Sequence, residues 1–402
     1  MYLKRLSLTN FRNFTRLDID VPRRSVLLVG DNAQGKTSVL EAIYFLAALT
    51  SFQTNADRQM VNFLEARKSP AVARIVGEYV RGTRTHKLEV RLILDPVGVG
   101  NGQHLRKEIL LDGVKKQASD AVGAPGAFSA VVFVPQMSQI IEGGPDERRR
   151  YLNLALAQAV PAYAGALSDY AKVIEQRNAL LKTLAERGGN ANQLDVWDES
   201  LVRLGAQIIQ WRIAAVQELE KEATRIHREL THGAEVLRLA YEPSYDPRPK
   251  MTLKLDTAAD RSGIELKEIE RGFLERLHAV RAEEIERGVT TLGPHRDELR
   301  FLANQIDLGD YGSRGQMRTA LLSLKLAEVS WIKSRTTQWP VILLDEVMAE
   351  LDLHRRADLL NYLGETEQSL LTATDLNMFP SEFTENAKVW HVVQGKVQTK
   401  ES

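Results

Sequence analysis

The segment Gly30-Asp31-Asn32-Ala33-Gln34-Gly35-Lys36-Thr37 is the feature that most constrains how this chain folds. It fits G-x-x-x-x-G-K-[ST], a pattern whose glycines let the backbone wrap round phosphates while amide groups and a helix N-terminus point at the anion. An apolar run over residues 25–29 precedes it, and a segment of helical composition over 38–49 follows. This strand–loop–helix context predicts a nucleotide-binding α/β domain.

We expect this loop to bind ATP together with Mg²⁺. Lys36 supplies a positive charge for the β- and γ-phosphates, and Thr37 supplies a hydroxyl for the metal ion. The residues expected to contact the nucleotide in this segment are Gly30, Asp31, Asn32, Ala33, Gln34, Gly35, Lys36, Thr37 and Ser38.

A second motif is the run Val341-Ile342-Leu343-Leu344 followed by two acids, Asp345 and Glu346. A buried strand delivers Asp345 to its carboxyl end, where α/β sheets bind ligands. We expect Asp345 to hold Mg²⁺ and Glu346 to orient and polarise the attacking water. Because strands often end in acids, this motif alone is weak evidence. Together with the phosphate loop it predicts ATP hydrolysis.

Composition excludes several classes of protein. Lys plus Arg equals Asp plus Glu, 53 each, so the chain is not a uniformly basic nucleic-acid binder, and any DNA contact must use a local patch or a face built by assembly. Cysteine is absent, which excludes disulfides and thiolate metal sites and suits a reducing cytoplasm. The most apolar stretch, residues 39–52, is too short to span a membrane, so no membrane partner is expected.

The chain changes character twice. Short strand patterns fill the first part, together with an Asp112-Gly113 hairpin signal, and apolar residues at helical spacing follow over 163–184 and 194–215. The break Gly188-Gly189-Asn190 between these stripes predicts an antiparallel helix pair, far too short for a long coiled-coil arm. Residues 241–250 are interpreted as a loop, and strand patterns return over 298–302, 341–344, 369–372 and 389–393.

The predicted fold class is therefore α/β, with one α/β domain split in sequence by a mainly helical lobe. We expect the N-terminal part of the ATPase lobe over residues 1–136, the helical lobe over 137–290, and the C-terminal part of the ATPase lobe over 291–402.

Ser313-Arg314-Gly315-Gln316 resembles the signature loop of ABC-type ATPases, and a helical stretch over 317–333 separates it from the acid pair. In that superfamily the loop caps the γ-phosphate of ATP held by a second head, with a helix N-terminus and a serine hydroxyl aimed at the anion. The resemblance implies nucleotide contacts from Ser313, Gly315 and Gln316, and a dimer that forms with ATP. The alternative interpretation is an ordinary helix N-cap and turn, because the same residue types occur there.

Three further positions resemble parts of ABC-type heads. Ala349-Glu350-Leu351-Asp352 resembles the D-loop, which implies that Asp352 lies at the nucleotide and the dimer interface. Thr374 stands at the switch position, where most relatives place histidine, and Gln136 resembles the Q-loop glutamine that reaches Mg²⁺. The residues for which a catalytic role is implied are Glu346, Lys36, Ser313, Gln136 and Thr374, and those expected at the metal ion are Thr37, Asp345 and Gln136.

Several blocks together resemble the RecF family of ABC-type ATPases, a mixed sheet with flanking helices plus an inserted helical second lobe. The blocks occur in order along nearly the whole chain: Leu6-Ser7-Leu8-Thr9-Asn10-Phe11-Arg12-Asn13-Phe14, Gly144-Pro145-Asp146-Glu147-Arg148-Arg149-Arg150-Tyr151-Leu152, Gln176-Arg177-Asn178-Ala179-Leu180-Leu181, Gly293-Pro294-His295-Arg296-Asp297 and Leu324-Lys325-Leu326-Ala327-Glu328. Two positions depart from the family pattern, Asn153, usually aspartate, and Gln136, often an acid.

The RecF resemblance implies a cytoplasmic bacterial ATPase that dimerises on ATP and binds DNA without sequence preference, as a duplex or a duplex–single-strand junction. It also implies action with RecO and RecR in recombinational repair of gaps, with hydrolysis releasing DNA. By the same resemblance Arg12 and Asn13 lie near the nucleotide. The arginine run 148–150 either contacts DNA or forms a solvated helix start, and His295 either serves the site or stabilises a turn.

Three other classes share part of this pattern. An ABC transporter head has the same nucleotide motifs but predicts a docking surface for a membrane partner. A long-armed chromosome-organising ATPase predicts heptads over hundreds of residues, which this sequence lacks. A binding scaffold would keep ATP as a structural ligand. The presence of Glu346, which is expected to orient the attacking water, argues against that interpretation.

Overall fold

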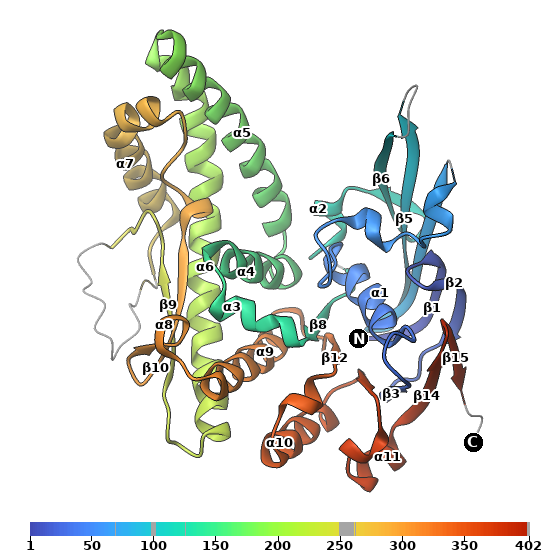
Figure 1. Cartoon of the computed structure of the whole chain (residues 1–402). Helices are drawn as coiled ribbons and strands as arrows, with labels where there is room; N and C mark the ends of the chain where they lie inside the picture. Colours follow the sequence, from blue (N-terminus) through green and yellow to red (C-terminus); the bar gives the residue numbers. More distant parts are fainter. Residues whose placement is uncertain (69, 98–101, 125, 249–260, 262, 400–402) are drawn as a thin grey trace. The chain divides into compact units, whose positions relative to one another are not determined.

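The computed structural model describes residues 1–68, 70–97, 102–124, 126–248, 261 and 263–399. The chain forms two compact units (Figure 1). Unit 1 comprises Met1–Met137 and Glu328–Ser402, and unit 2 comprises Ser138–Ala327. Among the described helices, none is both long enough and apolar enough to cross a membrane.

A mostly parallel sheet of unit 1 joins strands from both ends of the chain, in the order β15-β14-β3-β13-β12-β8. Its strands are β3 (Ser25–Val29), β8 (Ala130–Phe133), β12 (Val341–Asp345), β13 (Ser369–Ala373), β14 (Lys388–Val393) and β15 (Lys396–Thr399). Neighbouring strands from β14 to β8 pair in parallel, and β15 pairs with β14 in the antiparallel sense. The central strands are buried along nearly their whole length, as apolar runs in parallel sheets require. Their carboxyl ends therefore meet at one edge.

An antiparallel sheet completes unit 1, in the order β2-β1-β4-β5-β6-β7. Its strands are β1 (Tyr2–Phe11), β2 (Phe14–Asp20), β4 (Ala71–Arg81), β5 (Arg84–Val97), β6 (Gly102–Leu111) and β7 (Val114–Lys116). The predicted hairpin is confirmed, because Leu111 pairs with Val114 across Asp112 and Gly113, which have φ of 51° and 81°. Positive φ at both turn residues matches the right-handed twist of the strands.

Helix α1 (Lys36–Ala48) is apolar nearly all round because it is buried in the core of unit 1. That core also contains side chains of β1, β4 and β5 from the antiparallel sheet and of β3 and β12 from the parallel sheet. The other helices that lie wholly within the described part of unit 1 are α2 (Ala118–Ala121), α10 (Leu353–Gly364) and α11 (Ser381–Asn386). The start of α1, which follows the phosphate loop, is thus fixed by packing against two sheets.

Unit 2 is mainly helical. Its helices are α3 (Gln139–Glu142), α4 (Pro145–Ala159), α5 (Tyr163–Arg187), α6 (Asp195–Leu230), α7 (Leu266–Arg287), α8 (Leu308–Tyr311) and the first part of α9 (Arg314–Thr336), which continues into unit 1. The predicted helix pair is confirmed as α5 and α6, and Gly188 ends α5 with φ of 69°. Arg177 joins the helices, since its buried Nε donates to Asp198 of α6 at 2.7 Å and it also pairs with Glu284 of α7.

Two sequence-based boundaries need correction. The compact units place the second boundary after Ala327 and not after residue 290. The reason is a small sheet of order β11-β10-β9, in which β10 (Glu298–Ala303) pairs with β9 (Leu237–Glu242) and β11 (Ile306–Asp307) inside unit 2. Residues 241–242 are therefore strand and not loop, and residues 249–250 of the predicted loop lie outside the described part of the chain.

Candidate nucleotide-binding site

The predicted phosphate loop joins the end of β3 to the start of α1, whose first residue is Lys36. Glycine is required at Gly30 by the close approach of another backbone segment, and at Gly35 chiefly by the backbone conformation. A Cβ on Gly30 would lie 2.3 Å from the carbonyl oxygen of Val392, and a Cβ on Gly35 would lie 2.6 Å from Asn13 Nδ2. Gly35 also has φ of 113°, which L side chains rarely adopt. The loop conformation is therefore incompatible with larger residues at both positions.

Gln34 anchors the loop to two distant turns. Its carbonyl oxygen accepts from Asn13 Nδ2 at 3.0 Å, at the turn between β1 and β2, and from the Gly395 N–H at 3.0 Å. Its side-chain Oε1 accepts from the Gln394 N–H at 2.6 Å. The turn between β14 and β15 thus supports the phosphate loop from the far end of the sequence. Gln394 and Gly395 were missed by sequence reasoning, because a two-residue turn carries no signal of what it contacts.

Thr37 and Asp345 meet although they stand 308 residues apart. The Thr37 hydroxyl donates to Asp345 Oδ1 at 2.9 Å, and the Thr372 hydroxyl donates to the same oxygen at 2.8 Å. Burial raises the pKa of Asp345, and the two hydroxyl donors oppose that rise. A hydroxyl and a buried carboxylate side by side are the hard oxygen ligands that Mg²⁺ prefers. The structure therefore brings together two of the three predicted metal ligands.

Lys36 and Glu346 complete the centre of the site. The buried Lys36 Nζ donates to the carbonyl oxygens of Gly30 at 2.6 Å and Asp31 at 3.0 Å, and it lies 4.0 Å from Glu346 Oε1. Glu346 adopts a left-handed backbone with φ of 56°, and its N–H donates to Thr372 Oγ1 at 2.9 Å. Its side chain is 46% exposed. Glu346 is thus turned out of the strand toward solvent, while Asp345 stays buried.

A cleft of about 570 Å³ lies over the loop. The predicted residues that line it are Arg12, Asn13, Ala33, Gln34, Gly35, Lys36, Thr37, Ser38 and Glu346. The other wall consists of Gln53, Gln59, Val61, Asn62, Phe63 and Leu64, which sequence reasoning missed. Phe63 and Leu64 are each 68% exposed, and exposure of a particular apolar residue cannot be inferred from its identity.

Arg12 lines the cleft, but its guanidinium is engaged within unit 1. It donates to both carboxylate oxygens of the fully buried Glu41, at 2.7 and 2.6 Å, and to the carbonyl oxygen of Gln59 at 3.0 Å. Ser51 also donates to Glu41. A bidentate pair with a buried carboxylate is a strong interaction, so the structure gives Arg12 a role in shaping the cleft wall.

Gln136 and Thr374 lie outside the residues that line the cleft, as far as the chain is described. Both are exposed, Gln136 just after β8 and Thr374 just after β13. Since β8 and β13 are the two neighbours of β12, both residues follow strands that flank the one ending in Asp345. The topology thus places them at the edge of the sheet where β12 ends in Asp345.

The signature-like segment belongs to unit 2, where Ser313 directly precedes α9. The Ser313 N–H donates to Gln316 Oε1 at 3.0 Å, and the Gln316 N–H donates to Ser313 Oγ at 3.2 Å. This reciprocal arrangement is a capping box, which satisfies the free donors of a helix N-terminus. Ser313 and Gly315 are exposed. In unit 1, Asp352 caps α10 by accepting from the Arg355 N–H at 3.0 Å.

Two candidate residues from the sequence have structural roles in unit 2. Arg148 pairs with Glu298 at 2.6 Å and donates to the Gly143 carbonyl at 2.7 Å, which engages its guanidinium inside the unit. Burial lowers the pKa of His295 to about 4. Its neutral ring has Nε2 at 3.2 Å from the Thr290 carbonyl, which can only accept, so Nδ1 accepts from the Tyr170 hydroxyl at 2.8 Å.

The departure at Asn153 has a structural explanation. Its Oδ1 accepts from the Tyr163 hydroxyl at 2.7 Å and from Arg212 at 2.9 Å. Arg212 is buried and also pairs with Asp297 at 2.7 Å. A neutral amide oxygen serves both donors, and Asp297 already balances the arginine charge.

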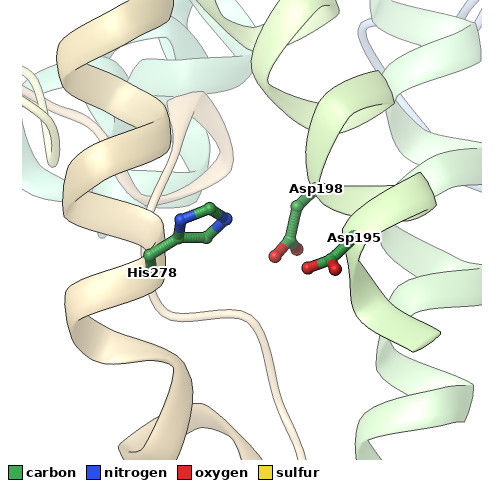
Figure 2. A group of neighbouring side chains, drawn as sticks. All are labelled: Asp195, Asp198 and His278. Atoms are coloured by element: carbon green, nitrogen blue, oxygen red, sulfur yellow. The ribbon is translucent and has the colours of Figure 1, made fainter. Parts of the chain in front are cut away.

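Asp195 and Asp198 of α6 and His278 of α7 form another group of polar side chains that point toward one another (Figure 2). Their potential ligand atoms lie within 4.8 Å of one another. Arg281 pairs with both carboxylates at 2.6 Å, and Asp198 also accepts from Arg177. Because these arginines already balance the acids, the group is explained by ion pairs that connect the helices.

A family profile and individual relatives both show similarity of this chain to RecF proteins. The profile of the family described as RecF/RecN/SMC N terminal domain matches residues 2–398. A protein described as DNA replication and repair protein RecF from Exiguobacterium sp. is 35% identical over 399 residues, covering 99% of this chain and 99% of that protein. One with the same description from Roseiflexus castenholzii is 38% identical over 408 residues, covering 98% and 99%.

Solved structures agree with this fold. One described as the recombination mediator protein RecF with ATP in the RecFOR pathway has a TM-score of 0.83 and 30% identity, over 100% of this chain and 98% of that chain. An SMC head bound to the C-winged helix domain of ScpA has a TM-score of 0.52 and 14% identity, covering 100% and 98%, which indicates a shared fold. The observed mixture of sheets and helices is that of a RecF- or SMC-type ABC ATPase head.

Proposed function

The chain belongs to the RecF family, and from this premise we propose that it is an ATP-binding, ATP-hydrolysing DNA repair protein whose copies pair on ATP and hold DNA. The observation that carries the proposal is the hydrogen bond between Thr37 and Asp345 beside the buried Lys36. It joins the phosphate loop and the acid pair into one site, which neither motif establishes alone.

The nucleotide would lie in the cleft over the loop, with its phosphates on the start of α1. Lys36 supplies charge to the β- and γ-phosphates, and the exposed Glu346 orients a water for attack. Thr37 and Asp345 would hold Mg²⁺, which supplies charge neutralisation at the transferred phosphoryl group. Two features support that fit, the shared hydrogen bond and the burial that raises the pKa of Asp345, because a bound cation would compensate a buried carboxylate.

Gln136 and Thr374 have supporting roles in this proposal. Their positions just after β8 and β13, beside the strand that ends in Asp345, suit a metal-linked glutamine and a hydroxyl that senses the γ-phosphate. A neutral hydroxyl makes a weaker hydrogen bond to phosphate than an imidazolium does. We therefore expect Thr374 to stabilise the bound γ-phosphate less than histidine would.

We further propose that ATP pairs two copies head to tail. The exposed Ser313 and the N-terminus of α9 would meet the γ-phosphate held by the other copy, and Asp352 would lie at the same interface. The pair would hold DNA by its backbone without sequence preference, and hydrolysis would release it by removing the phosphate that joins the heads. RecO and RecR are the proposed partners, consistent with the pathway named for the similar RecF structure. A cytoplasmic location remains a prediction.

Sedimentation of the purified chain with and without ATP, and with ATP plus short duplex DNA, tests this proposal. We expect the wild type to pair only with ATP and DNA to sediment with the pair. Lys36→Met should lose ATP binding, whereas Ser313→Arg should keep ATP binding and lose pairing. Ser381→Arg places the same charge at another exposed helix start and should behave as wild type. Normal pairing of Ser313→Arg would contradict the proposed dimer, and a monomer indifferent to DNA would contradict the proposed function.

A further inference from the structure

The side chain of Gln316 is oriented from both of its ends. Its Oε1 accepts from the Ser313 N–H at 3.0 Å, and its Nε2 donates to Glu235 Oε1 at 2.8 Å. Rotating the amide by half a turn would place its NH₂ against the Ser313 N–H and its oxygen against a carboxylate oxygen. Both contacts would then be repulsive. The Glu235 carboxylate therefore selects the orientation in which Gln316 completes the capping box.

Glu235 is itself held by a buried histidine. Its Oε2 lies 3.1 Å from Nε2 of His227, a fully buried residue of α6. The other ring nitrogen lies 3.1 Å from Ser323 Oγ, and Ser323 donates to the Thr319 carbonyl at 2.7 Å. An ionised carboxylate only accepts, so Nε2 carries a hydrogen toward Glu235. Because the Ser323 hydrogen is directed to Thr319, Nδ1 carries a hydrogen toward Ser323 Oγ.

These contacts form a series of hydrogen bonds that starts in the first turn of α9 and ends in the same helix about two turns later. It runs from Gln316 through Glu235 and His227 to Ser323, entirely within unit 2. The end of this hydrogen-bond series at His227 and Ser323 is buried. The other end is partly exposed, because the Glu235 side chain is 18% exposed and Gln316 is half-buried. Solvent screening reduces the contribution of a partly exposed carboxylate to stability. The arrangement therefore has more consequence for the direction of the Ser313 group than for the fold.

We propose that Glu235, held by His227, is a positioning residue that fixes Gln316 and so aims the Ser313 hydroxyl and the first N–H groups of α9 at the γ-phosphate of ATP held by a second copy of the chain. This inference rests on the proposed function and deepens it, since it names a residue outside the signature segment that the composite site needs. Glu235 acts through Gln316 and does not touch the nucleotide.

The test measures the dissociation constant for pairing of the full-length chain in a slowly hydrolysed ATP analogue, and separately the affinity of the monomer for that analogue. We expect Glu235→Ala to weaken pairing roughly tenfold, the effect of one lost orienting hydrogen bond, with unchanged analogue affinity. Glu235→Gln should restore pairing to within about threefold, because its amide oxygen accepts from Gln316 and its NH₂ donates to Nε2 of a His227 ring whose hydrogen is on Nδ1.

A double-mutant cycle distinguishes positioning from general destabilisation. In a Gln316→Ala background, Glu235→Ala should have no further effect on pairing, because its action passes through Gln316. The inference would be overturned if Glu235→Ala reduced the pairing affinity equally in the wild-type and Gln316→Ala backgrounds. Loss of analogue affinity in Glu235→Ala would also overturn it. Normal pairing of Glu235→Ala beside failed pairing of Ser313→Arg would overturn it while leaving the proposed function intact. Failure of the wild type to pair would overturn both.

Discussion

Thr372→Val is the substitution whose effect can be derived most directly from the site. Valine has nearly the same shape as threonine, so it creates no cavity, but it removes two hydrogen bonds. The Thr372 hydroxyl no longer donates to the buried Asp345 carboxylate, a 2.8 Å contact, and the Glu346 N–H loses the oxygen that accepts it at 2.9 Å. A hydrogen bond to a charged group contributes about 1.5–3 kcal/mol and an orphaned donor costs about 1 kcal/mol. We expect the free energy of unfolding of unit 1 to fall by about 2.5–4 kcal/mol.

Native-state hydrogen exchange at the amides of β12 and β13 measures this loss where it occurs, without assuming that both units unfold together. The expected loss corresponds to faster exchange by about 70-fold to 1,000-fold. Thr374→Val is the matched control, since Thr374 follows the same strand but is exposed, and it should change stability by less than about 0.5 kcal/mol. In an Asp345→Asn background the cost of Thr372→Val should fall, because a neutral acceptor replaces a charged one. Exchange of Thr372→Val within about twofold of wild type would refute the reasoning.

Three other outcomes follow from the same structure. Arg12→Met leaves the buried Glu41 unpaired and should destabilise the protein by about 3–5 kcal/mol in thermal unfolding, with recovery when Glu41 is also replaced by Met. Because burial lowers the pKa of His295 to about 4 from an ordinary 6.5, the unfolded chain takes up a proton first as pH falls. Stability should therefore decline by about 2–3 kcal/mol from pH 6.5 to pH 4, a decline that His295→Gln removes. Gly395→Ala should lower ATP affinity, because its Cβ would lie 2.6 Å from a carbonyl oxygen of the turn between β1 and β2; Gly82→Ala, with similar φ and nothing within 4 Å, is the control.

Much of unit 1 could be predicted from local patterns. The run 25–29 is β3 as predicted, the hairpin at Asp112-Gly113 is present, and the apolar run before Asp345 is β12. Apolar runs between turn signals identify buried strands because a parallel sheet excludes polar side chains from both faces. The missed elements lacked such a signal. For example, β9 (Leu237–Glu242) has no apolar run, and the alternation of its buried residues is short and leads directly into a segment with three prolines.

The sequence alone determined the charged and hydroxyl groups at the centre of the site, because the phosphate loop and the acid pair are each encoded within a few consecutive residues. Only the tertiary structure decided which partners those groups have. Arg12 pairs with the buried Glu41, the turn at Gln394 supports Gln34, and Gln316 donates to Glu235. Each contact joins residues between 29 and 360 positions apart. Such contacts depend on how sheets and helices pack, and periodicity within a short segment does not encode that packing.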